Sequence, residues 1–165
     1  MIVRREMAGD VAAVRRVICL AFDGDDEAGL VDRLRADGDL ILSLVAEQDG
    51  QVIGHVAFSR LSIANDSGVT PGVSLAPVGI LPQMQRKGAG RALIEAGHDQ
   101  LRHVGETVVF VLGDPVYYSR FGYSVKGADA FDCAYAGPYF QWLRLSPQAP
   151  AAGVISYAPA FGGLG

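Results

Sequence analysis

Hydrophobic and polar residues follow two periods along this chain, one typical of strands and one typical of helices. Residues 40–63 form two β-rich runs around Asp49-Gly50, a dipeptide that favours a tight turn, so they predict a hairpin. Residues 67–72, SGVTPG, have a loop composition. Further strands are predicted at 2–6, 73–82, 107–113, 131–145 and 153–161.

Four segments carry the period or the capping residues of helices. The first follows a predicted N-cap at Asp10, and the second spans residues 23–39 and stops at Gly38. The third, residues 88–103, is amphipathic, and its polar outer face includes His98, which we interpret as a surface residue. The fourth, residues 114–122, is short. This order of strands and helices predicts one α/β domain with a mixed sheet over residues 1–165.

Composition narrows the function classes. No apolar run reaches the roughly 18 residues of a membrane helix, and the N-terminus has no signal-peptide pattern. The net charge of −4 argues against nucleic-acid binding. Cys19 and Cys133 make no disulfide framework and fit a reducing compartment. We therefore expect a cytoplasmic protein without membrane or nucleic-acid partners.

The heptapeptide QRKGAGR, residues 85–91, breaks the charge pattern expected where a helix begins. It contains Arg86, Lys87 and Arg91 and no acid, although the positive end of the helix dipole disfavours cations. Its two glycines let a ligand approach the free N–H groups of the first helical turn. A bound pyrophosphate would offset the cations, so we favour a phosphate site over a solvated loop.

Two common phosphate-binding motifs do not fit this turn. A Walker loop requires GxxxxGK[ST], which is absent from the chain. A dinucleotide fold requires GxGxxG after a first strand, whereas residues 88–93, GAGRAL, lack the third glycine and lie in the middle of the chain. A nucleotide-binding enzyme is therefore kept only as a rival hypothesis.

The pattern Gln85-x-x-Gly88-x-Gly90, preceded by APVGILP and followed by an amphipathic helix, resembles motif A of the GCN5-related N-acetyltransferase (GNAT) family. DDEAGLVDRLRADGD, QVIGHVAFS and VVFVLGDPVYYSRFGY are similar, in order, to segments of its YhbS-like branch, and the likeness covers nearly the whole chain. The resemblance implies a mostly antiparallel sheet of about seven strands, flanked by about four helices and splayed between strands four and five. It also implies acetyl-CoA as co-substrate and an amine as acceptor.

The family's pantetheine arm lies in that splay and pairs with the backbone of strand four. Pro77 independently indicates a bulge or an open edge there, because proline cannot donate to a ladder. Asp114 is by default an N-cap, but it also lies at the end of strand five, beside the cleft. The resemblance thus implies these cofactor-binding residues: Val78, Gly79, Ile80, Gln85, Arg86, Lys87, Gly88, Ala89, Gly90, Arg91 and Asp114.

Acetyl transfer from a thioester requires a proton or a dipole for the leaving thiolate. The family's general acid is a tyrosine four residues before the glycine of Y-x-x-x-G-[FY], which corresponds here to Tyr118 before Gly122. A phenol with a pKa of about 10 stays protonated at neutral pH. We expect Tyr117 to be structural or to face the substrate.

The other catalytic groups are less defined. The oxyanion donor is expected at the backbone N–H of Val78 or Gly79. Residues 74–79 offer no carboxylate as general base, so His55 on the third strand and a water path are the candidates, although a lone strand histidine more often packs. No His, Cys and Asp set has metal-ligand spacing, so no metal is expected.

The acceptor is not identified by the motifs. Asp23, Asp25, Asp26 and Glu27 lie between the first two helices, where they either hold a cationic acceptor or cap a helix. The cationic candidates are a polyamine, an aminoacyl group or a lysine-bearing chain. A non-catalytic acyl-CoA-binding module is the rival to an enzyme. Aromatic residues in the closing strands make a homodimer a further candidate: Tyr135, Tyr139, Phe140 and Trp142.

Overall fold

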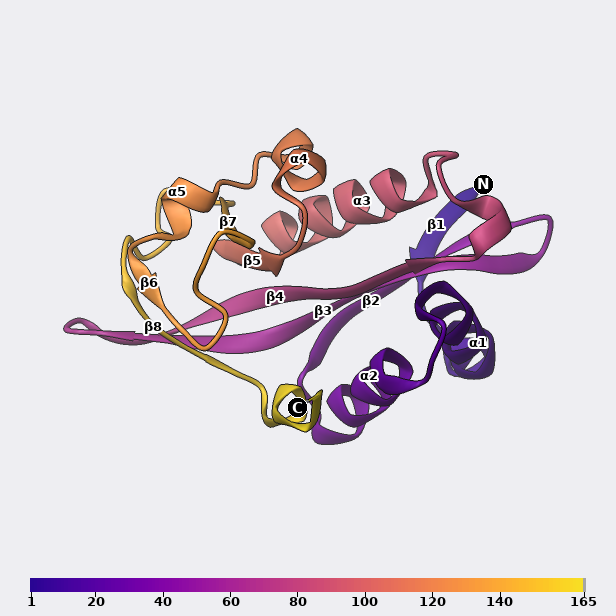
Figure 1. Cartoon of the computed structure of the whole chain (residues 1–165), viewed down its shortest axis with the longest axis horizontal. Coiled ribbons are helices and arrows are strands. Elements are labelled where there is room, and N and C mark those ends of the chain that lie inside the picture. The colour runs from indigo at the N-terminus through magenta and orange to yellow at the C-terminus, as the bar shows by residue number, and fades with distance from the viewer. Residues whose placement is uncertain (165) are drawn as a thin grey trace.

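A long sheet separates two groups of helices in the computed structural model, which describes residues 1–164 (Figure 1). Helices α1 (Val11–Phe22) and α2 (Asp26–Asp37) and the C-terminal 3-10 turn Pro159–Leu164 lie on one side of the sheet. Helix α3 (Ala89–His103) and the short helix α4 (Pro115–Tyr118) lie on the other. One further short helix, α5, spans Val125–Ala128.

The sheet contains eight strands and is mostly antiparallel. Its main path runs β1-β2-β3-β4-β5-β7, while β8 pairs with β3 and with β6. Only the pairs β4–β5 and β6–β8 are parallel. The strands are β1 (Ile2–Arg5), β2 (Leu40–Gln48), β3 (Gln51–Asn65), β4 (Gly68–Ile80), β5 (Val108–Leu112), β6 (Phe131–Asp132), β7 (Phe140–Arg144) and β8 (Gly153–Tyr157).

The predicted splay between strands four and five is confirmed. Strand β4 pairs with β5 only over residues 73–75, and its continuation to Ile80 pairs with β3 alone. The β3–β4 register shifts between Val56 and Phe58, where three steps along β4 match two along β3. The extra residue lies beside Pro77, so the bulge expected at that proline is also confirmed.

Three predicted boundaries were wrong, each for a local reason. Residues 67–72 are not a loop, because β3 and β4 stay paired out to Asn65 and Gly68, and the Asn65 side chain accepts a hydrogen bond from Ser67 N–H at 2.9 Å. The strand predicted at 131–145 divides into β6 and β7 around the turn that holds Gly137. The last strand ends at Tyr157, before Pro159 opens a 3-10 turn.

The helix predictions hold with two corrections. Asp10 does not cap α1 with its side chain, because its carboxylate accepts from Met7 N–H at 2.7 Å and pairs with Arg4. His98 is not a surface residue: it is buried, and its Nε2 lies 2.8 Å from the Tyr123 hydroxyl. The caps at Gly38 and Asp114 are as predicted.

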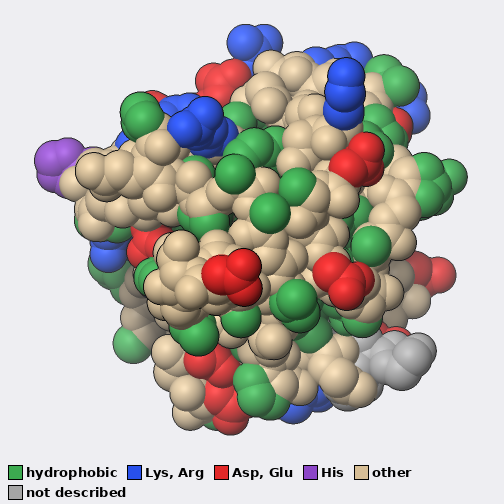
Figure 2. Space-filling model, turned by 90° about the vertical axis from the view of Figure 1, so that its left-hand side faces the viewer, with side chains coloured by type: hydrophobic (Ala, Val, Ile, Leu, Met, Phe, Trp, Pro, Cys, Tyr) green, Lys and Arg blue, Asp and Glu red, His purple; other side chains and the backbone are tan. Residues whose placement is uncertain are grey.

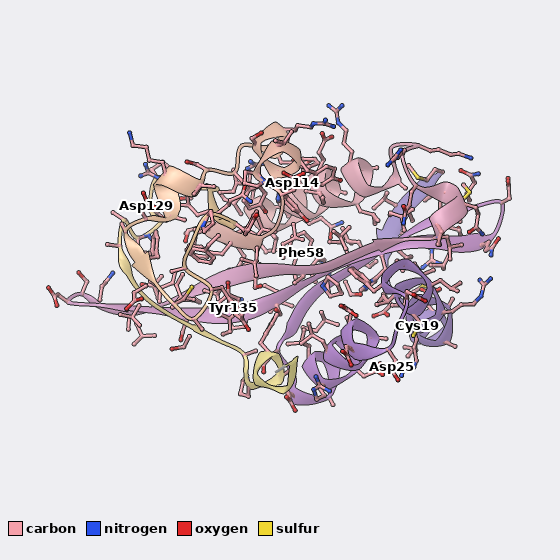
Figure 3. All side chains as sticks on the ribbon, in the orientation of Figure 1. Cys19, Asp25, Phe58, Asp114, Asp129 and Tyr135 are labelled. Carbon is pink, nitrogen blue, oxygen red and sulfur yellow. The ribbon has the colours of Figure 1, made fainter. Side chains whose placement is uncertain are left out.

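The main core fills both faces of the sheet. On one face the ring of Phe58 packs directly under Gly97 of α3, where any side chain would collide with the ring. Figure 3 shows Phe58 between the long strands and α3. A glycine inside α3 costs helix stability but lets this helix lie close to the sheet. The N-terminus of α3 is thereby held beside the end of β4.

Candidate functional site

The open edge of β4 presents backbone groups that do not pair with β3. Leu81 donates to the Ile53 carbonyl at 2.9 Å, so the next hydrogen-bonded pair along this antiparallel ladder is Gly79 with His55. The backbone N–H and C=O of Val78 and Ile80 therefore point away from β3, toward the splay. Gly79 serves a different purpose, because a side chain there would press on Ala21 and Phe22 of α1 at 3.2 and 3.3 Å.

The turn from β4 into α3 has the geometry expected of an anion site. Gly88 has φ +92° with nothing within 4 Å of where a Cβ would stand, so its backbone is open to a ligand. The ladder of α3 begins where Ala92 donates to the Gly88 carbonyl, which leaves the N–H groups of Ala89, Gly90 and Arg91 free at the helix end. The Gln85 side chain donates to the Ile80 carbonyl at 3.2 Å and ties the turn to the splay.

The three cations of this turn differ from one another. Arg91 already pairs with Glu95, one helical turn on, at 2.7 Å. Arg86 and Lys87 are exposed and have no acidic partner among residues 1–164. Arg86 has φ +62°, a left-handed conformation that is uncommon for a side-chain-bearing residue and holds the turn in its tight path. The uncompensated charge of the turn therefore resides on Arg86 and Lys87.

The two neighbouring tyrosines of α4 face different parts of the cleft. The Tyr117 hydroxyl lies 3.0 Å from where a Cβ of Gly90 would stand, so this side chain covers the first turn of α3. The Tyr118 ring instead packs against Gly113, where a Cβ would come within 2.5 Å of it. The two rings are perpendicular, with centroids 5.0 Å apart.

Tyr118 is held in an aromatic cluster that keeps its phenol protonated. Its ring contacts Tyr123 edge-to-face at 5.7 Å, and Tyr123 is anchored through its hydroxyl to His98. Burial raises the pKa of Tyr118 to about 12. Burial likewise lowers the pKa of His98 to about 4, so the imidazole behind the cluster is neutral at physiological pH.

A cavity of about 400 Å³ opens beside Tyr118, on the α1–α2 side of the splay. Residues 74–78 of β4 form one wall, and the α1–α2 segment contributes Phe22, Glu27 and Leu30. Tyr135, Tyr157 and Phe161 from the closing segments also line the cavity. Figure 3 shows Tyr135 beneath the long strands, on the side of the C-terminal turn. These closing residues were not predicted to line a site, because nothing in their local sequence marks them.

The acidic segment between α1 and α2 does not act as one group. Glu27 lines the cavity and is half-buried, whereas Asp23, Asp25 and Asp26 are exposed and line none of it. Figure 3 shows Asp25 in the connection between α1 and α2. Asp25 and Asp26 lie at the N-terminal end of α2, where acids stabilise the helix dipole.

His55 lies outside this cavity. It is fully buried on β3, its Nε2 lies 2.7 Å from the Ser43 hydroxyl, and burial lowers its pKa to about 3. Among the described residues no cluster of three His, Cys, Asp or Glu side chains could hold a metal ion, and Cys19 and Cys133 are free thiols. Asp114 caps α4 by accepting from Val116 N–H at 2.9 Å.

Comparison with known proteins identifies the family of this chain. Residues 3–126 match the family model of the acetyltransferase (GNAT) domain. The chain is a member of the GNAT acetyltransferase family. The resemblance inferred from the Gln85–Gly90 pattern is therefore confirmed.

Relatives within the family match nearly the whole length of this chain. It is 36% identical to the uncharacterized N-acetyltransferase YhbS of Escherichia coli K12 over 98% of both chains. The crystal structure of E. coli YhbS in complex with CoA superimposes with a TM-score of 0.88 at 34% identity, covering 98% of this chain and 91% of that one. A GNAT acetyltransferase from Brucella melitensis, crystallised with acetyl-CoA, gives 0.82 at 39% identity over 97% of each chain.

The surface of the closing strands does not form one apolar patch. Phe140 is buried, Tyr135 and Trp142 are partly buried, and only Tyr139 of the four predicted aromatics is exposed. Figure 2 shows acidic, basic and hydrophobic side chains interspersed on the end of the molecule that lies at the left of Figure 1. A homodimer through these strands stays a prediction. Within residues 1–164 no helix combines the length and apolar character needed to cross a bilayer.

Proposed function

We propose that this protein transfers an acetyl group from acetyl-CoA to an amine by direct attack, with Tyr118 as general acid. The observation that carries the proposal is that Tyr118 lines a cavity of about 400 Å³ together with residues 74–78 of β4, the strand whose edge is open at the splay. A thioester laid along that edge would have its sulfur near a protonated phenol and its carbonyl toward the cavity. The CoA and acetyl-CoA complexes of its two relatives support the choice of co-substrate.

The cofactor would use two kinds of contact. Its pyrophosphate would accept hydrogen bonds from the free N–H groups at the start of α3 and lie close to Arg86 and Lys87. Its pantetheine arm would pair with the outward-facing backbone of Val78 and Ile80, as an added strand would. Of the two expected oxyanion donors we favour the Val78 N–H, because the Gly79 N–H faces β3.

Tyr118 would supply the proton that the departing thiolate needs. A phenol whose pKa is raised by burial to about 12 is fully protonated at neutral pH. The thiolate is a weaker base than the phenolate at that value, so proton transfer would accompany C–S cleavage instead of preceding it. An acyl-CoA-binding module without turnover is the alternative, and thiol release on addition of an amine distinguishes it.

The decisive test is calorimetric titration with acetyl-CoA, CoA and ATP on the wild type and on Gly88→Glu. We expect acetyl-CoA to bind the wild type and to lose at least about 100-fold in affinity when an anionic side chain occupies the phosphate turn. Gly105→Glu is the matched control, because Gly105 also has a positive φ, +88°, and open space around it, but lies at the other end of α3. Tight ATP binding with no acetyl-CoA binding would instead favour the nucleotide hypothesis.

A further inference from the structure

The cavity beside Tyr118 is walled mainly by aromatic and aliphatic side chains. Tyr135 and Tyr157 meet edge-to-face with ring centroids 4.9 Å apart, and Tyr157 meets Phe161 at 5.2 Å. Pro77 and Leu30 line the same cavity, and Leu30 packs in one cluster with Phe161 and Tyr157. Such a wall binds a ligand through its apolar area, and its edge-to-face rings are held in fixed orientations.

Glu27 is the one carboxylate that lines this cavity. It is half-buried, and it has no ion pair or hydrogen bond to another side chain within residues 1–164. Every other residue that lines the cavity is apolar, a tyrosine or Ser74. A partly desolvated carboxylate in an apolar setting favours a cationic partner, and no basic side chain of the cavity supplies one.

From these contacts we infer that the acceptor is a primary amine carried on a compact, uncharged, apolar body, whose ammonium group pairs with Glu27. This inference rests on the proposed acetyltransferase function and specifies its substrate class. A single aromatic ring or branched aliphatic group with a short linker fits a cavity of about 400 Å³.

The same contacts disfavour two of the candidates suggested by the acidic segment, a polyamine and a lysine-bearing chain. A polyamine would bring a second ammonium group against the Tyr135–Phe161 wall, where no second carboxylate lies. Burying an unpaired ammonium group costs far more free energy than its cation–π contacts with the rings contribute. Asp25 and Asp26 do not relieve this, because both are exposed outside the cavity.

The reaction balances with these two side chains. The ammonium group that pairs with Glu27 loses one proton to solvent, and the neutral amine attacks the thioester carbonyl. The new C–N bond forms and the C–S bond breaks, while Tyr118 gives its proton to the leaving thiolate sulfur. The amide nitrogen returns its remaining extra proton to Tyr118, so one proton leaves for each CoA thiol formed.

The test is an acceptor series with acetyl-CoA and a thiol readout: ethylamine, 2-phenylethylamine, spermidine and a lysine-bearing peptide with a blocked N-terminus. We expect kcat/KM for 2-phenylethylamine to exceed that for ethylamine by at least about 30-fold, because the ring is buried. It should exceed the values for spermidine and the peptide by at least about tenfold.

The role of Glu27 is tested separately with Glu27→Gln. We expect the KM for 2-phenylethylamine to rise about tenfold or more, while acetyl-CoA affinity measured by calorimetry is unchanged. Asp26→Asn removes the same charge from the adjacent exposed residue and should leave this KM as it is. Thermal melting of both variants checks that each is folded.

The outcomes separate the two levels of the argument. Acetylation of spermidine or the peptide in preference to 2-phenylethylamine would overturn the substrate class while leaving the acetyltransferase proposal standing. Equal KM values for Glu27→Gln and Asp26→Asn would overturn the role of Glu27. Acetyl-CoA binding without thiol release for any of the four amines would overturn both, and would favour a binding module.

Discussion

The two sides of the splay are built on different principles. The cofactor side consists of exposed backbone and exposed cations: the free N–H groups of Ala89, Gly90 and Arg91, and the side chains of Arg86 and Lys87. The proposed acceptor side is a cavity lined mainly by aromatic and aliphatic side chains, with the single carboxylate of Glu27. The cofactor side suits a highly charged ligand whose structure does not vary. The acceptor side suits a ligand recognised by its shape.

This difference predicts effects of different size for substitutions on the two sides. Removing a side chain from the cofactor side leaves the backbone donors in place, so each such change should be small. Removing a side chain from the acceptor side deletes a group with no substitute, so each such change should be large. The predictions below test this contrast from the largest expected effect to the smallest.

Tyr118→Phe should have the largest effect. Because the phenol is the proposed proton donor, we expect kcat to fall by about 10²- to 10⁴-fold, with acetyl-CoA affinity nearly unchanged. Tyr117→Phe should act in the opposite way, weakening acetyl-CoA binding modestly, because its hydroxyl lies over Gly90. Steady-state thiol release and calorimetry on both variants provide the measurement, and equal kcat values for the two would contradict the assignment.

Acidification should destabilise the fold because two histidines, His98 on α3 and His55 on β3, are buried. Burial lowers the pKa of His98 to about 4 and that of His55 to about 3, whereas an unfolded histidine has a pKa of about 6.5. Between those values the unfolded chain binds more protons, so the free energy of unfolding decreases as pH falls. We expect a loss on the order of 2 kcal/mol per histidine between about pH 6.5 and pH 4.5, measured by urea unfolding.

The contribution of His98 to that slope can be isolated. His98→Gln should lower stability at neutral pH and flatten the pH dependence, since the substituted chain has one fewer buried base. His103→Gln is the control, because His103 is an exposed residue of the same helix. A pH dependence that is identical in both variants would argue against the neutral, buried state of His98.

Lys87→Gln should have the smallest effect. An exposed cation beside a phosphate contributes about 0.3 to 1 kcal/mol, so we expect acetyl-CoA affinity to fall about two- to fivefold and to depend less on salt. Lys126→Gln, which removes an exposed lysine from α5, should change neither quantity. Calorimetry at two salt concentrations measures both. An acceptor KM with the same salt dependence would contradict the proposed difference between the two sides.

The contrast also explains which parts of the site the sequence predicts. The phosphate turn is contiguous, and its glycines and cations are unusual at a helix start, so Gln85–Arg91 stands out locally. The splay is marked by Pro77, because proline has no N–H for a ladder. Tyr118 is located through the family resemblance, and the structure adds the reason that Gly113 precedes it.

The acceptor cavity was harder to predict because its walls are distant in sequence. Glu27, Tyr135 and Phe161 come together only through the packing of α2 and the C-terminal turn. The local pattern of Glu27 is that of any acid in the first turn of a helix. His98 was misassigned for a related reason: a polar residue on an amphipathic helix looks exposed until Tyr123 provides its hydrogen bond.

The bulge beside Pro77 shifts the alternation of odd- and even-numbered residues between the two faces of β4. Before the bulge, Leu75 lies opposite Phe58 and on the same face of the sheet. After the bulge, Val78 and Ile80 lie on that face, opposite Val56 and Gly54. The residues on this face are therefore odd-numbered before the bulge and even-numbered after it. Deleting Ala76 would restore a uniform alternation and leave Val78 and Ile80 opposite Val56 and Gly54, so the bulge would be lost while the pairing on either side of it is kept. The inserted residue therefore changes the strand locally, beside Pro77, just beyond the point where β4 stops pairing with β5.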